Sequence, residues 1–161
     1  MDHGSRLQAI ARRAMIKYGL EPDWPPAARA ELARLAEQPA AALRDLRGLP
    51  WSSIDNDESR DLDQLEVCTD GAVPRLLIAI ADVDALVPKG SALDAHAENN
   101  TTSVYTPAHV FPMLPPELSN DRTSLNEDAD RSAIVIDMEV ATTGSCAGRR
   151  STGRACGTAP S

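Results

Sequence analysis

The chain has 161 residues with a net charge of -8 and a pI of about 4.8, and only 3% of the residues are aromatic. This length allows one domain or part of a larger one. The negative charge argues against a simple basic nucleic-acid binder, which needs clustered Lys and Arg to displace counterions from phosphates. An enzyme that acts on RNA through bound metal ions is compatible with it, because such ions reverse the local field of the carboxylates that hold them.

The cysteines and the N-terminus bear on the compartment. Cys68, Cys146 and Cys156 match no zinc-binding spacing, and their odd number argues against a closed disulfide framework. The first residues lack the basic and apolar segments of a secretion signal, and no apolar run is long enough to span a bilayer. The sequence therefore predicts a cytoplasmic protein without membrane contact.

Helices are expected in the first 48 residues. Apolar residues recur at helical spacing over 5–18, and Gly19 is a natural stop. A second helix is expected over 25–37, because two prolines at its start suit the first helical turn. A short third helix is expected over 40–46. Together these segments predict a small helical cap.

The pattern changes to that of strands from residue 49. Strands are expected over 51–54, 62–68, 75–83 and 132–140, and a helical turn over 94–99. The segment RLLIAIADV, 75–83, is the strongest of these, and its nearly continuous apolar run predicts burial on both faces of a sheet. The predicted fold class is α+β, with a short helical N-terminal region, 1–48, followed by a mixed β-sheet over 49–140.

The last segment, 141–161, differs in composition from the rest. It is rich in Gly, Ser, Thr, Ala and Arg and has no large apolar residue. Such a segment cannot bury enough surface to offset the entropy lost on ordering, so it is expected to be disordered. The abrupt change after Val140 also suggests a frameshift or a truncation of a longer coding sequence.

Acidic side chains crowd the stretch SIDNDESRDLDQLE, residues 53–66. In an extended segment Asp61 and Asp63 project from the same face, and a loop can bring Asp55 beside them. Three like charges held together repel one another, so a cation is expected among them. Hard oxygen ligands suit Mg²⁺, and two such ions can activate water and stabilise the leaving oxygen in phosphodiester hydrolysis.

Two other interpretations of this acidic stretch compete with a magnesium site. The first is a solvated acidic turn. The second is a calcium loop of the EF-hand type. Asp55, Asp57, Ser59, Asp61 and Glu66 fall at positions one, three, five, seven and twelve of such a loop. Arg60, however, stands where that loop needs Gly for its sharp turn, and the flanking segments are strand-like rather than helical.

Four blocks of sequence, in the same order, resemble the catalytic domain of the ribonuclease II/ribonuclease R family. They are LPWSSIDNDESRDLDQLEV, LLIAIADVDALVPKGSALDAHA, TTSVYTPAHVFPMLPPELSNDRTSLN and DRSAIVIDMEV. The resemblance runs from Leu49 to Val140 and covers the N-terminal part of that domain. It leaves out the first 48 residues and the tail, most of the family's RNA channel, and the flanking RNA-binding barrels of the OB type.

This resemblance implies a magnesium-dependent enzyme, with Mn²⁺ as an alternative ion, that degrades single-stranded RNA from 3′ to 5′ into nucleoside 5′-monophosphates. By motif position, Asp55, Asp61 and Asp63 correspond to three of the family's four active-site aspartates, with catalytic and metal-binding roles. Tyr105 takes the place of a tyrosine that stacks on a base near the cleaved end. Gln64 replaces the fourth aspartate, so a second ion is expected to bind more weakly.

Because the resemblance covers only part of the catalytic domain, the chain is expected to degrade RNA poorly. The alternative interpretation is a non-catalytic remnant that binds metal or RNA, or an interaction module for an unknown protein partner. Magnesium-dependent activity on a short single-stranded RNA separates these interpretations. A calcium-binding module would instead show calcium preference without RNA cleavage.

Overall fold

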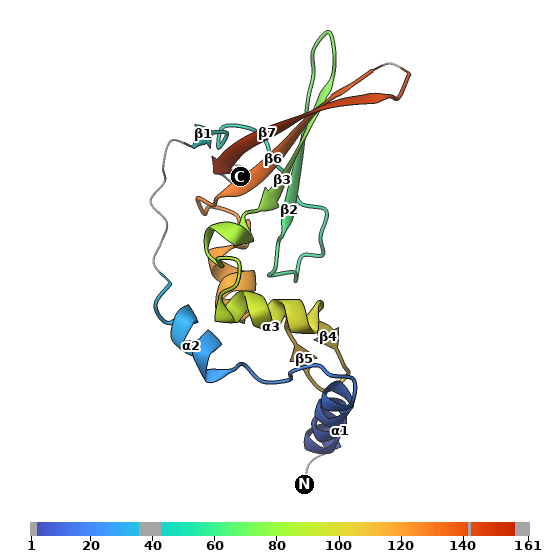
Figure 1. The fold of residues 1–161 in the computed structure, drawn as a ribbon. Helices are drawn as coiled ribbons and strands as arrows, with labels where there is room; N and C mark the ends of the chain where they lie inside the picture. Colours follow the sequence, from blue (N-terminus) through green and yellow to red (C-terminus); the bar gives the residue numbers. More distant parts are fainter. Residues whose placement is uncertain (1–2, 36–42, 142, 157–161) are drawn as a thin grey trace. The chain divides into compact units, whose positions relative to one another are not determined.

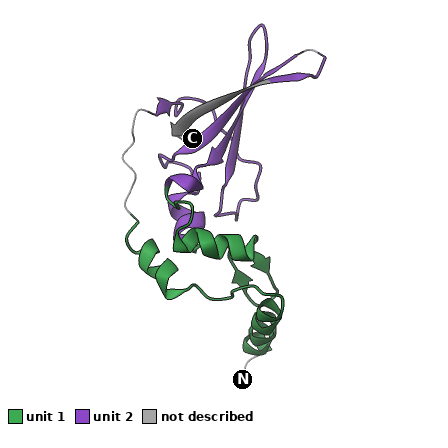
Figure 2. Cartoon of the chain, in the orientation of Figure 1, with its two compact units in different colours: residues 1–37, 86–116 green, residues 38–85, 117–161 purple. Residues whose placement is uncertain are grey.

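The computed structural model describes residues 3–35, 43–141 and 143–156 of the chain. It forms two compact units, which Figure 2 colours separately. The helical unit contains 1–37 and 86–116, and the sheet unit contains 38–85 and 117–161. The chain therefore passes from the helical unit to the sheet unit, returns, and ends in the sheet unit. This division differs from the three continuous ranges expected from the sequence.

The helical unit contains α1 (His3–Lys17), α2 (Pro26–Leu32), α3 (Ala92–Asn100) and the antiparallel strands β4 (Val104–Tyr105) and β5 (Val110–Phe111). The predicted first helix and the helical turn at 94–99 are confirmed (Figure 1). The second helix begins at the prolines as predicted but ends at Leu32, and residues 36 and 37 lie outside the described residues. The β4–β5 hairpin was not predicted.

Side-chain hydrogen bonds hold the helical unit together. Ser91 caps α3 by accepting the Asp94 amide N–H at 3.2 Å, which fixes where the helix begins. The Leu93 amide donates to the Glu31 carboxylate at 3.1 Å and so ties α3 to α2. Buried Asn100 closes the other end of α3, because its amide group bonds both the N–H and the carbonyl oxygen of Glu21 at 2.8 and 2.9 Å.

The sheet unit is built on a five-stranded mixed sheet with the order β1-β7-β6-β3-β2 (Figure 1). Its strands are β1 (Arg44–Asp45), β2 (Gln64–Thr69), β3 (Arg75–Ala81), β6 (Ala133–Val140) and β7 (Cys146–Cys156). The β1–β7 pair is parallel and the other pairs are antiparallel. The predicted α+β class and three of the predicted strands are confirmed. At 51–54 only Ser52 pairs, through an isolated bridge to Glu66.

The sheet buries one face. Its core cluster consists of Leu46, Trp51, Leu65, Val67, Leu77, Ala79, Leu125, Ala133 and Val135. The six core residues that lie on β2, β3 and β6 alternate with less buried ones, as the two-residue period of a strand requires. The Trp51 indole N–H donates to the Leu46 carbonyl at 2.9 Å, so the one polar atom of that side chain is satisfied in the core.

The prediction that 75–83 is buried on both faces was wrong. Leu77 and Ala79 are buried, but Ile80 on the opposite face is 39% exposed, and the strand ends at Ala81. Ile80 pairs with Ile134 of β6, which is 41% exposed. The apolar run therefore supplies a second apolar face that the described residues cover only in part.

Two further predictions need correction. The expected third helix over 40–46 lies partly outside the described residues, and Arg44–Asp45 forms strand β1 instead. The tail, expected to be disordered, forms β7 over Cys146–Cys156 and pairs with β6 along most of its length. Backbone hydrogen bonds form this ladder, so small and polar side chains can belong to it. Residues 157–161 lie outside the described residues. None of the described helices is long and apolar enough to cross a membrane.

Candidate active site

The acidic stretch forms a loop that leads into β2. Ser52 and Glu66 close the loop by exchanging backbone hydrogen bonds of 2.9 and 2.8 Å. Within it, the Ser59 amide donates to the Asn56 carbonyl at 2.9 Å and forms a turn. The two ends of the acidic stretch are therefore fixed to each other at the sheet edge.

A second set of hydrogen bonds fixes the end of the loop nearest β2. The Leu62 amide N–H donates to the Ser124 hydroxyl at 3.0 Å, and the Leu125 amide donates to the Leu62 carbonyl at 2.8 Å. On the next residue, the Ala81 amide donates to the Asp63 carbonyl at 2.9 Å. Leu62 also packs against the core cluster. The backbone on which Asp61 and Asp63 stand is thus held by two neighbouring segments.

The structure places the three predicted carboxylates on this loop, all exposed to solvent. Asp61 and Asp63 flank half-buried Leu62, and both are exposed. Asp55 lies further back in the loop, where its carboxylate accepts a hydrogen bond from the Ser53 hydroxyl.

The donor chemistry of this loop suits Mg²⁺, because exposed carboxylate oxygens are hard ligands. Whether these carboxylates lie close enough together to hold one ion is a separate question. Within the described residues, no group of three or more His, Cys, Asp or Glu side chains is arranged to hold a metal ion. We call Asp61 and Asp63 the anchored pair, because hydrogen bonds fix the backbone around them; a three-carboxylate site with Asp55 would require the loop to rearrange.

Gln64, the position where the family resemblance implies a fourth aspartate, is engaged elsewhere. Its amide donates to one carboxylate oxygen of Glu66, two residues further along the same strand. Residues 64 and 66 share one face of β2, while buried Leu65 occupies the core face. The other Glu66 oxygen is buried and has no hydrogen-bond partner among the described residues.

Tyr105 lies in the helical unit, at the end of β4. Its side chain is 71% exposed, so both faces of the ring can be reached from solvent. The hairpin that carries it is fixed next to the ring, because the Thr106 hydroxyl donates to the His109 carbonyl at 2.6 Å and accepts the His109 amide at 3.1 Å. An exposed aromatic ring on a short, closed hairpin is suited to stacking on a base.

Ser124 was not singled out by the sequence. It is 1% exposed, and its hydroxyl lies 2.9 Å from the Arg60 carbonyl as well as accepting the Leu62 amide. One buried hydroxyl therefore holds the backbone on both sides of Asp61. A sequence signal existed only in the block TTSVYTPAHVFPMLPPELSNDRTSLN, where Ser124 belongs to a matched motif without an assigned role.

The carboxylate loop and strands β2, β3 and β6 lie in the part of the chain that a protein-family model matches. The RNB domain matches residues 43–154. The chain therefore belongs to the RNB-domain family. The match begins before Leu49 and extends past Val140 into β7, so the expected limits of the resemblance were too narrow.

Individual relatives agree with this family. The chain is 42% identical to ribonuclease R of Vibrio cholerae over 154 residues, which cover 92% of this chain and 18% of the relative. It is 41% identical to ribonuclease R of Escherichia coli with the same coverage. Its structure is similar to Mycoplasma genitalium RNase R in complex with ribose-methylated single-stranded RNA, with a TM-score of 0.81, 26% identity, and coverage of 96% of this chain and 24% of that one. The chain spans about a fifth of the length of these curated relatives.

Proposed function

We propose that this chain takes part in the 3′-to-5′ hydrolysis of single-stranded RNA, with Asp55, Asp61 and Asp63 as the carboxylates of a magnesium site. The observation that carries the proposal is the anchored Asp61–Leu62–Asp63 segment in a chain of the RNB-domain family. Support for the RNA substrate comes from the M. genitalium relative, which was solved with single-stranded RNA.

Each residue has a separate part in this proposal. The Asp61 and Asp63 carboxylates hold the ion or ions, and Ser124 keeps their backbone in place. Bound Mg²⁺, or Mn²⁺ in its place, supplies Lewis-acid stabilisation of charge on the phosphodiester oxygens. Tyr105 stacks on a base without regard to its identity, as a sequence-tolerant nuclease requires.

The test uses the full 161-residue chain with a 5′-labelled single-stranded RNA and Mg²⁺. Asp63→Asn should abolish the release of mononucleotides, whereas Asp70→Asn, the same charge change at an exposed position after β2, should leave it intact. Equal release by the two variants would show that the carboxylate loop is not the site.

A second function is favoured by one observation, the lack of a three-carboxylate metal group among the described residues. In that case the chain is a non-catalytic module that binds RNA or metal. RNA binding by the wild type, with no Mg²⁺- or Mn²⁺-dependent cleavage and no effect of Asp63→Asn, would establish this second function over the first.

A further inference from the structure

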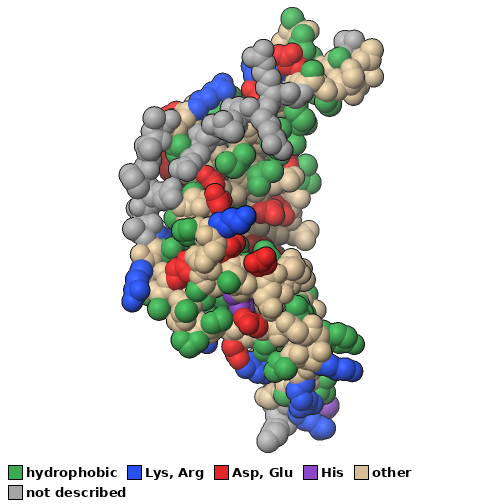
Figure 3. Space-filling view, viewed as in Figure 1, with side chains coloured by type: hydrophobic (Ala, Val, Ile, Leu, Met, Phe, Trp, Pro, Cys, Tyr) green, Lys and Arg blue, Asp and Glu red, His purple; other side chains and the backbone are tan. Residues whose placement is uncertain are grey.

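Helix α1 has a charge opposite to that of the chain as a whole. Its fifteen residues, His3–Lys17, include four Arg or Lys residues and no Asp or Glu, while the chain carries a net charge of -8. Figure 3 shows Lys and Arg side chains gathered on the surface that α1 forms. Helix α1 is thus a locally positive element of an acidic chain, with four of the sixteen Lys and Arg residues.

Three of the four cations form a row along one side of α1. At 3.6 residues per turn, Arg6, Arg13 and Lys17 fall within about 40° of one another, and the 1.5 Å rise separates the first two by about 10 Å and the last two by about 6 Å. The fourth, Arg12, points elsewhere and pairs with Asp23. We call Arg6, Ile10, Arg13 and Lys17 the basic row.

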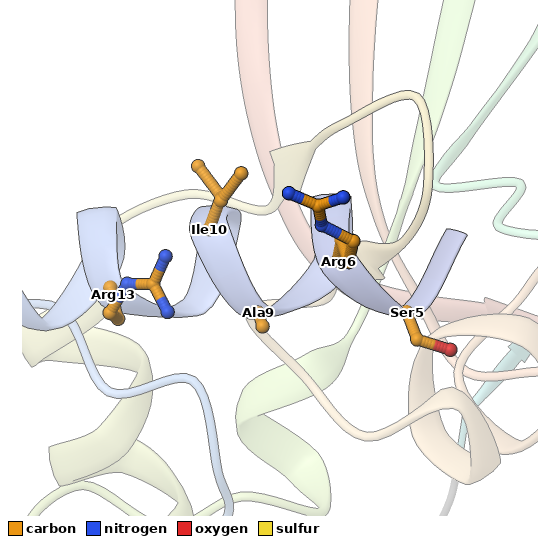
Figure 4. Close-up of a pocket in the computed structure, with 5 residues that line it drawn as sticks. All are labelled: Ser5, Arg6, Ala9, Ile10 and Arg13. Atoms are coloured by element: carbon orange, nitrogen blue, oxygen red, sulfur yellow. The ribbon is translucent and has the colours of Figure 1, made fainter. Parts of the chain in front are cut away.

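The basic row is open to a ligand. All four of its side chains are exposed, and Ile10 lies between Arg6 and Arg13 along the helix (Figure 4). A groove on this side of α1 is lined by Ser5, Arg6, Ala9, Ile10 and Arg13. Among the residues that the structure describes, no ion pair joins Arg6, Arg13 or Lys17 to a carboxylate.

The geometry of α1 favours a polyanion over a membrane surface. A helix that lies in a bilayer interface buries its apolar side in lipid. The apolar side of α1 includes Met15, which is 4% exposed because it packs within the protein. Leu7, Ile10 and Ile16 of the same helix are 48%, 53% and 58% exposed, so burial of Met15 removes only part of the apolar side, and the spacing of the cations decides the choice. What α1 offers instead is a line of cations at intervals of about 6 and 10 Å, which can meet successive charges on a chain of phosphates.

We propose that the basic row of α1 binds the sugar–phosphate backbone of RNA, as a second contact outside the carboxylate loop. This inference rests on the proposed function for the identity of the polyanion. The row captures RNA by charge and reads no base, so the contact has no sequence preference. It also gives an acidic chain a local surface that compensates for its net charge.

The experiment measures binding of labelled single-stranded RNA to the full chain in EDTA, across a range of salt concentrations. We compare Arg13→Gln/Lys17→Gln with a control of equal charge change in the same unit, Arg29→Gln/Arg34→Gln, at two exposed positions. The slope of log K against log salt is negative, and loss of two phosphate contacts should reduce its magnitude by about 1.4, since each contact to a single strand contributes about 0.7. The control should keep the wild-type slope.

Oligo(A) and oligo(U) should weaken equally in the row variant. Thermal melting verifies that both variants are folded, and Arg6→Gln/Arg13→Gln provides a second row variant if the first does not fold. Equal slopes for the row and control variants would overturn the proposal, because net charge alone would then explain the binding. The proposal would also be overturned if the row variant lost binding to anionic lipid vesicles while its RNA binding was unchanged.

This binding test is independent of hydrolysis because EDTA removes the metal. Row-dependent RNA binding in a chain that shows no Mg²⁺-dependent cleavage would support the basic row and reject the catalytic part of the proposed function. Cleavage that depends on Asp63, with no effect of the row variant on RNA binding, would support the catalytic part of the proposed function and reject the basic row.

Discussion

The hydroxyl of Ser124 accepts the amide N–H of Leu62 at 3.0 Å, across 62 residues of sequence. Ser124 comes from the segment that leads toward β6, whereas Leu62 stands between the two anchored carboxylates. The same hydroxyl lies 2.9 Å from the Arg60 carbonyl and 3.0 Å from the Asn126 side-chain oxygen. The geometry of the carboxylate loop therefore depends on a buried serine hydroxyl as well as on the loop's own residues.

Ser124→Ala should destabilise the sheet unit by about 1–3 kcal/mol, because it leaves the Leu62 amide buried without an acceptor. The variant should also weaken Mg²⁺ binding, since the backbone on both sides of Asp61 loosens. Chemical denaturation and metal titration measure the two effects. Ser119→Ala, at a half-buried serine of the same region whose hydroxyl bonds the neighbouring Asn120 side chain, is the control and should change neither quantity.

Arg75 and Asp137 form an ion pair between β3 and β6. Arg75 donates through Nε to one Asp137 oxygen at 3.0 Å and through a second nitrogen to the other, and the Asp137 side chain is only 8% exposed. Arg75→Met should destabilise the chain by about 1–2 kcal/mol, after allowance for the 46% exposure of the arginine, because it strands a buried carboxylate.

The double variant Arg75→Met/Asp137→Leu should recover most of that stability, since it removes both charges together. Denaturant unfolding of the two variants provides the measurement. If the double variant is less stable than the single one, removing the stranded charge of Asp137 does not restore stability, which would contradict this explanation.

Metal titration can separate the magnesium and calcium interpretations of the acidic loop. Asp61→Asn should weaken Mg²⁺ and Mn²⁺ binding, because Asp61 is one of the anchored pair. Asp57→Asn changes the same charge in the same loop and should have little effect. In a calcium loop Asp57 would be a ligand at the third position, so Asp57→Asn would weaken binding and the wild type would prefer Ca²⁺. Calorimetry of the two variants with each ion decides between them.

The sequence predicted those elements whose apolar residues repeat. The strands β2, β3 and β6 begin and end close to their predicted limits because alternating Leu, Val and Ile positions face one core. Strand β7 could not be predicted in this way, since its place is fixed by backbone pairing with β6 rather than by apolar side chains. The two-residue strands β4 and β5 are shorter than any period that a pattern can reveal.

The same distinction applies to the site. Asp61 and Asp63 stand two residues apart, so the sequence predicts that they share one face of an extended segment, and both are exposed in the structure. The hydrogen bonds that fix them come from Ser124 and Ala81, residues brought near only by folding. The contact of Gln64 could not be predicted either. Its amide donates to Glu66, and the motif position by itself gave no sign of that contact.

Asp45 provides a prediction for acidic pH. Its hydrogen bonds with the side chain and backbone of Arg47 lower the pKa of the carboxyl from 3.8 to about 2. Because the folded pKa lies below the unfolded one, the contribution of this pair to stability is present above about pH 4 and is lost as the pH falls toward 2. In Arg47→Gln, the pKa of Asp45 measured by NMR should rise toward 3.8. An unchanged pKa would contradict the role of Arg47.

The last prediction concerns catalysis by the 161-residue chain, which we expect to degrade RNA poorly. Hydrolysis needs the RNA end held so that water, phosphorus and leaving oxygen align, and such positioning can supply roughly 7–11 kcal/mol of the barrier reduction. The chain spans only about a fifth of the V. cholerae and E. coli relatives. It offers Tyr105 as a stacking contact worth about 1–3 kcal/mol, and that cannot replace a whole RNA channel.

Single-turnover assays on monodisperse protein, with Mg²⁺ and labelled single-stranded RNA, measure this activity beside Asp63→Asn. We expect slow release of mononucleotides by the wild type and none by Asp63→Asn. The same assays on the basic-row variant separate the capture of RNA from its positioning. Lower RNA binding by this variant at low salt indicates that α1 captures RNA. An unchanged cleavage rate at saturating RNA indicates that positioning limits the reaction. Rapid processive release of mononucleotides, lost in Asp63→Asn, would instead mean that this chain alone suffices to align the scissile phosphate.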